Sequence, residues 1–117
     1  MKHCGPATLA FFAFACCGLA GQRVRTFQGE VLDSQCAKTG GHEIMVKRIG
    51  ARDEPECVRD CVSMGGVYVL YDASTKSVYQ LDDQRIAARF GGHKVKVAGT
   101  FDKSTNTIHF SRMDPAT

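Results

Sequence analysis

Hydrophobic and polar residues alternate along the last third of the chain in a way typical of β-strands. In HKVKVAGTF, residues 93–101, valines and lysines take opposite faces, and Gly99 suits the bend that a barrel strand needs. In TIHFSRM, residues 107–113, the period repeats with Ile108 on the inner side and His109 on the outer side. The two segments predict a hairpin with one apolar and one polar face.

Three further segments are predicted to be strands because they are rich in β-branched and aromatic residues. FQGEVLD, residues 27–33, alternates imperfectly, and Gly29 in it is a candidate bulge. VYVLY, residues 67–71, and SVYQL, residues 77–81, are separated by a short polar turn and predict another hairpin.

Two segments carry the signals of helices. Asp53 can cap a helix over residues 54–64, Pro55 suits its first turn, and two glycines follow its end. A shorter helix is predicted over residues 84–90, where apolar residues recur at helical spacing.

The order of these elements predicts a mainly β protein of the α+β class. One helix lies between the first and second strands, and a short helix lies between the third and fourth. This is the order of a five-stranded antiparallel barrel like the oligonucleotide/oligosaccharide-binding (OB) fold. The alternative is an open α+β sheet with the longer helix packed on one face.

The first 20 residues have the features of an export signal. One lysine precedes an uncharged apolar run, and small residues end it, which predicts cleavage after Ala20. Residues 21–117 then form a single small domain that is periplasmic or secreted. The alternatives are an uncleaved leader, which would be the only membrane association, and lipidation at Cys16 or Cys17.

Charge and motifs exclude several classes of function. Without Lys2, 14 of the 15 basic residues remain against 12 acidic ones, and the charges are interspersed, so no nucleic-acid partner is expected. No constellation for hydrolysis or group transfer is present, which argues against an enzyme. We therefore expect a binding or structural module of the cell envelope, with a ligand or protein partner that the sequence does not identify.

Four segments carry a resemblance to a known family. They are GEVLDSQC (29–36), CVRDCVSMGGVYVLYD (57–72), VYQLDD (78–83) and GGHKVKVAGTFDKSTNTIHF (91–110). Taken in order, they resemble a group of short exported bacterial proteins of unknown function with a presumed OB-like β-barrel. The resemblance implies the fold and the export, and it implies no activity.

The domain retains three cysteines, Cys36, Cys57 and Cys61. A helix over residues 54–64 places the last two one turn apart on one face with parallel side chains, which disfavours a bridge between them. The first hypothesis is therefore a structural disulfide from Cys36 to Cys57 or Cys61. By lowering the entropy of the unfolded chain, it would stabilise the fold by about 3 kcal/mol. The third thiol stays buried or reactive, and a disulfide-linked dimer remains open.

The second hypothesis is a metal site. Two cysteines at positions i and i+4 of a helix present both sulfurs to one point, Cys36 supplies a third thiolate and His42 a fourth ligand. Such a Cys₃His set suits zinc or reduced copper. Asp33 could orient one of these ligands without binding the metal itself. A redox-active thiol is the third reading, although the C-x-x-C pattern of thioredoxin-like proteins is missing.

Two tyrosines on the first predicted hairpin are candidates for ligand contact. Alternation places Tyr68 on the face opposite Val67 and Val69, which predicts an exposed side chain. Tyr79 lies on the next strand. In OB-type barrels such strands can present aromatic rings to a ligand.

Overall fold

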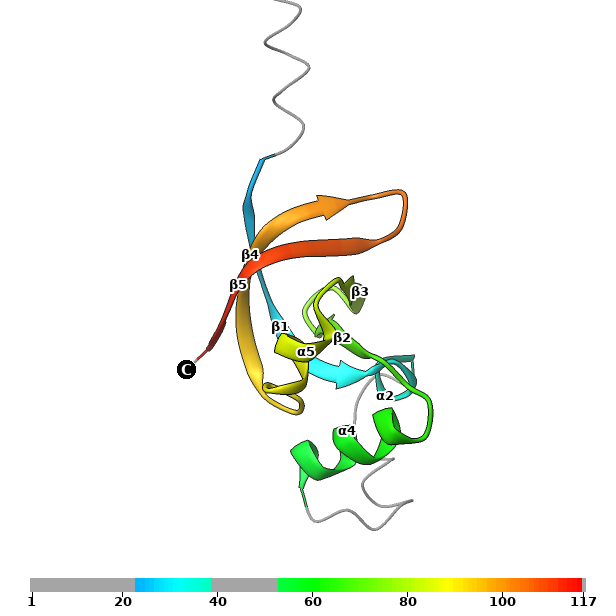
Figure 1. The fold of residues 1–117 in the computed structure, drawn as a ribbon. Helices are drawn as coiled ribbons and strands as arrows, with labels where there is room; N and C mark the ends of the chain where they lie inside the picture. The colour runs from blue at the N-terminus through cyan, green and yellow to red at the C-terminus, as the bar shows by residue number, and fades with distance from the viewer. Residues whose placement is uncertain (1–22, 39–52, 117) are drawn as a thin grey trace, which may run out of the picture.

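The structure, a computed structural model, describes residues 23–38 and 53–116. Five strands and three short helices confirm the predicted mainly β, α+β class (Figure 1). In chain order they are β1 (Arg25–Asp33), α2 (Ser34–Lys38), α4 (Glu54–Ser63), β2 (Tyr68–Asp72), β3 (Ser77–Leu81), α5 (Gln84–Ala88), β4 (Lys94–Asp102) and β5 (Thr107–Pro115). Both predicted helices are present at their predicted places, and α2 was not foreseen. The predicted leader and His42 lie outside the described residues.

The strands pair in the cyclic order β1-β2-β3-β5-β4, so that each has two neighbours. Four of the pairings are antiparallel, as predicted. The fifth, between β3 and β5, is parallel and short, running from Gln80 opposite Thr107 to Leu81 opposite Ile108. The prediction of a purely antiparallel sheet is wrong at this contact, because β3 and β5 run in the same direction where they meet.

β1 changes partner along its length. Its first part, up to Glu30, pairs with β4, and from Glu30 onward it pairs with β2. The predicted bulge at Gly29 is wrong, since Gly29 pairs in continuous register with Val95. A side chain is excluded there because a Cβ would lie 2.5 Å from the carbonyl oxygen of Tyr71. The register shift lies between β4 and β5 instead: Ala98 pairs with Arg112 and Gly99 with Phe110, so Ser111 of β5 is the extra residue opposite the predicted bend at Gly99.

The core combines the inner face of the sheet with the undersides of the helices. Val95 and Val97 are fully buried and the alternating Lys94 and Lys96 are exposed, as the alternation predicted. β2 does not alternate, because its residues from Tyr68 to Tyr71 are all buried. Helices α2 and α5 contact β2, which explains why both of its faces lack solvent. The prediction that Tyr68 is exposed is therefore wrong, and its side chain is only 9% exposed.

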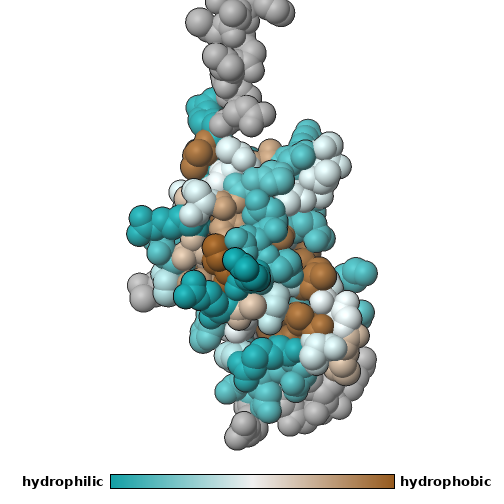
Figure 2. All heavy atoms as spheres, viewed as in Figure 1, coloured by the Kyte–Doolittle hydropathy of each residue, from teal (hydrophilic) through white to brown (hydrophobic). Residues whose placement is uncertain are grey.

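Helices α2 and α4 lie together at one end of the sheet. Figure 1 shows α2 and α4 beside the end of β1, while the β4–β5 hairpin extends away from them. Figure 2 shows a mainly hydrophilic surface on the face viewed, interrupted by separate apolar patches. In the described part of the chain, no helix has both the length and the apolar character needed to cross a membrane.

Candidate metal centre

The three cysteines of the domain meet at the helical end of the sheet. Cys36 comes from α2 and the other two from α4, and all three sulfur atoms lie within 4.8 Å of one another. Cys36 and Cys57 are fully buried, and Cys61 is 4% exposed. All three are free thiols, so the disulfide favoured by the sequence is not present among the described residues. The sequence hypothesis did place Cys36 within reach of both helix cysteines, and the structure brings all three together.

Local sequence explains how α4 presents two of the sulfurs. The helix begins at a capped position, where the Asp53 carboxylate accepts a hydrogen bond from the Glu56 N–H at 2.9 Å. It ends at Ser63, with Met64 as its C-cap, and Gly65 follows with φ of 111°, a conformation that favours glycine. Between these signals Cys57 and Cys61 stand one turn apart and face the sheet.

Asp33 positions the third sulfur. It is fully buried, and its carboxylate accepts hydrogen bonds from the backbone N–H groups of Gln35 at 2.8 Å and Cys36 at 3.1 Å. Asp33 therefore caps the short helix that carries Cys36, which supports the positioning role predicted for it. Gly66 packs against this carboxylate, because a Cβ added there would lie 3.1 Å from an Asp33 oxygen.

The exit of β1 is tied to the entry of β2 beside the cluster. The Ser34 N–H donates to the Val67 carbonyl oxygen at 2.8 Å, and the Val67 N–H donates to the Ser34 hydroxyl at 3.3 Å. These bonds connect α2 to the turn that follows α4. The three sulfurs are thus held by two helices that are fixed to the same part of the sheet.

The electrostatics of the cluster favour neutral thiols. Burial, followed by the nearby Asp33 charge, raises the pKa of Cys61 to about 11. Burial also raises the pKa of Cys36, together with a hydrogen bond from its thiol to Asp33. The pKa of Cys57 is likewise raised by burial. A nucleophilic cysteine needs thiolate character, so these three are poor candidates for redox catalysis.

The spacing of the sulfurs suits one metal ion. Metal–sulfur bonds of about 2.3 Å place three thiolates around an ion about 3.8–4.0 Å apart. The sulfurs, all within 4.8 Å of one another, would need to approach by about 1 Å at most. In the part of the chain that the structure describes, no carboxylate or imidazole joins the three sulfurs at this spacing. The fourth ligand predicted from sequence, His42, lies outside the described residues.

The two candidate tyrosines do not share a surface. The Tyr68 ring packs against Gly91, where a Cβ would lie 3.1 Å from it. Tyr79 makes edge contacts with Phe27 and Phe101, each at 5.5 Å between ring centroids. Arg25 covers the Phe27 ring at 4.6 Å. Tyr79 thus belongs to a packed aromatic cluster.

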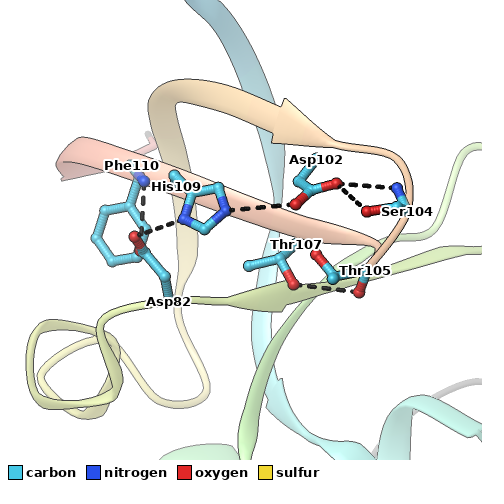
Figure 3. A network of polar contacts seen from close by, with 7 residues as sticks. All are labelled: Asp82, Asp102, Ser104, Thr105, Thr107, His109 and Phe110. Carbon is cyan, nitrogen blue, oxygen red and sulfur yellow. Dashed lines mark hydrogen bonds and ion pairs between the residues drawn. The ribbon is translucent and has the colours of Figure 1, made fainter.

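A polar network on β5 was not foreseen from the sequence (Figure 3). The His109 Nδ1 atom lies 3.2 Å from Asp82, and its Nε2 atom lies 4.0 Å from Asp102. Hydrogen bonds from Ser104 lower the pKa of Asp102. His109 remains 51% exposed, as expected for an outward position, so this network lies at the surface. The outward His109 was the signal that the sequence offered. Asp102 ends the other strand of the same hairpin, whereas Asp82 comes from a segment 27 positions away.

A second unforeseen feature is a carboxyl pair. Burial and the neighbouring Glu54 at the start of α4 together raise the pKa of Glu30 to about 8, against the opposing effect of Lys94. Glu30 and Lys94 also line a cavity of about 590 Å³ between β1, β4 and the β2–β3 turn. The two glutamates are 24 positions apart in the sequence, which gave no sign of their proximity.

Comparisons with protein-family models, curated proteins and solved structures find no match to this chain. What the cysteine cluster can bind is therefore inferred from its own donor atoms. Three buried sulfurs that converge from two helices form a soft donor set, of the kind that binds copper(I) or zinc.

Proposed function

We propose that this chain is an exported, non-enzymatic module of the cell envelope that binds one soft metal ion through Cys36, Cys57 and Cys61. The observation that carries the proposal is the mutual approach of three buried sulfurs to within 4.8 Å. The closed order of strand pairing supports an OB-like barrel as the scaffold. The helices between β1 and β2, α2 and α4, would then serve as the metal-binding elements of this scaffold.

A metal explains the cluster better than a disulfide does. A disulfide uses two sulfurs and leaves the third without a role, whereas one ion uses all three. The geometry of α4 supports this, because Cys57 and Cys61 run parallel on one helix face and both face Cys36. Burial of all three sulfurs also argues against a disulfide-linked dimer.

Copper(I) is the ion that the described ligands favour. Three thiolates satisfy this soft, monovalent ion, whereas zinc in structural sites takes four ligands. Zinc binding would therefore need a fourth donor, a role that His42 could fill. In an oxidising compartment thiols compete by forming disulfides, and a bound ion would protect them.

The test measures thiols and metal on the same protein. The mature protein is loaded with Cu(I) or Zn(II) without oxygen, and its mass is recorded under native and denaturing conditions after thiol alkylation. We expect one bound ion, no alkylation of the loaded protein and three alkylated cysteines after denaturation. Cys57→Ser should abolish binding, whereas Ser63→Ala, on the exposed end of the same helix, should retain it.

A mass lower by two hydrogens, a single alkylatable cysteine and no metal uptake after reduction would refute the proposal. The module would then be a disulfide-stabilised scaffold. Reduction should loosen such a scaffold, and chelation should leave it unchanged. The metal-binding module should respond in the opposite way, because metal binding is coupled to folding.

A further inference from the structure

Two cysteines of α4 and the methionine at its C-cap follow one another at helical spacing, a series called the sulfur line below. Cys57, Cys61 and Met64 occupy positions i, i+4 and i+7, which share a helix face. Their exposure rises along this line from 0% at Cys57 to 4% at Cys61 and 69% at Met64. The last of these sulfur-containing residues is therefore accessible to solvent, whereas the two cysteines are buried.

The turn after α4 leaves the outer end of this line open. Met64 is the C-cap residue, and its N–H donates to the carbonyl oxygens of Asp60 and Cys61, both at 3.2 Å. Gly65 follows, and a Cβ added there would meet nothing within 4 Å. The position after Met64 therefore borders open space.

Exposed apolar side chains concentrate at this turn. Among the described residues, the large hydrophobic side chains that remain exposed are Val24, Met64 and Val67, and two of these three flank the glycine pair. Scattered exposed hydrophobic residues need no explanation. Met64 differs from such residues, because its thioether follows two buried thiols and is itself a soft metal ligand.

We propose that Met64 is a transient ligand that captures incoming Cu(I) and passes it through Cys61 to the buried cluster. This inference rests on the proposed function. A thioether has no proton to lose, so it binds the ion without releasing one. Each cysteine that then binds the ion loses its thiol proton to water. With each new bond one old ligand leaves: first the ligands of the copper donor, and finally Met64. The copper stays Cu(I) throughout, so no oxidant or reductant is needed.

The experiment separates the rate of loading from the strength of binding. Reduced apoprotein is mixed without oxygen with Cu(I) held by bicinchoninate, and loss of the coloured complex is followed by stopped flow. The variants are Met64→Leu, which preserves size and apolarity, and Met113→Leu as the control. Met113 is a buried methionine on β5, outside the sulfur line. Affinity is measured separately by equilibrium competition with the same chelator.

We expect Met64→Leu to load roughly tenfold more slowly than the wild type, with an affinity within about twofold of it. Met113→Leu should match the wild type in both measurements. Equal loading rates for wild type and Met64→Leu would overturn the inference and leave the proposed function standing. An equal loss of rate and affinity would also overturn it, because Met64 would then be a permanent ligand. If neither the wild type nor either variant takes up copper, the proposed function itself is refuted.

Discussion

The carboxyl group of Glu30 offers the sharpest test of the electrostatics of the fold. It lies where β1 changes partner from β4 to β2, beside the start of α4. Burial, followed by the neighbouring Glu54, raises its pKa from 4.5 to about 8. The folded protein therefore holds a proton on Glu30 near neutral pH, whereas the unfolded chain has already released it.

The sign of the pH dependence follows from this difference. Because the folded pKa is the higher one, the contribution of Glu30 to stability is complete below about pH 4.5 and is lost as pH rises to about 8. The whole interval would correspond to about 5 kcal/mol for a fully buried group. Glu30 is partly exposed, so solvent screening reduces the expected loss to about 1–2 kcal/mol.

Glu30→Gln keeps the shape of the protonated side chain and removes the titration. We expect the variant and the wild type to be equally stable at pH 4.5, and the variant to be about 1–2 kcal/mol more stable at pH 8. Urea unfolding at several pH values measures both free energies. Asp60→Asn, at an exposed position on α4, is the control and should not reproduce the divergence. Parallel pH profiles for Glu30→Gln and wild type would refute the reasoning, because Glu30 would then be ionised in the folded state.

Three further substitutions test the local structure around the sheet and the site. Asp33→Ala should lower stability by about 1–3 kcal/mol in chemical unfolding, since it leaves buried backbone N–H groups unpaired; an unchanged midpoint would contradict its capping role. Gly99→Ala should cost about 1–3 kcal/mol, because the new Cβ would overlap the His109 carbonyl oxygen; a thermal midpoint like that of the wild type would contradict this close packing. His109→Ala should change stability by less than about 1 kcal/mol at any pH, as its ion pairs are exposed; a larger loss in pH-dependent thermal scans would show that the network is structural.

Local signals in the sequence determined most of the elements. Residues 77–81 were predicted as a strand and form β3, and the helix predicted over 54–64 ends one residue earlier. These predictions succeeded because caps, glycine stops and alternation act through neighbours in the chain. The same local reasoning placed two cysteine sulfurs on one face of α4.

Tertiary structure decided what the local pattern could not contain. Tyr68 is buried because helices cover β2 from outside, a fact that alternation along one strand cannot express. The parallel contact of β3 and β5 depends on how the sheet closes.

The candidate site shows the same division. The i, i+4 spacing on α4 predicted two adjacent sulfurs, but only the packing of α2 against α4 brings Cys36 within 4.8 Å of both. The raised pKa values of the cysteines and of Glu30 likewise arise from burial and from neighbours distant in sequence. The sequence alone determined which donor atoms are available and which helix face carries two of them. The fold decided that they meet, because burial and long-range contacts exist only after the chain has packed.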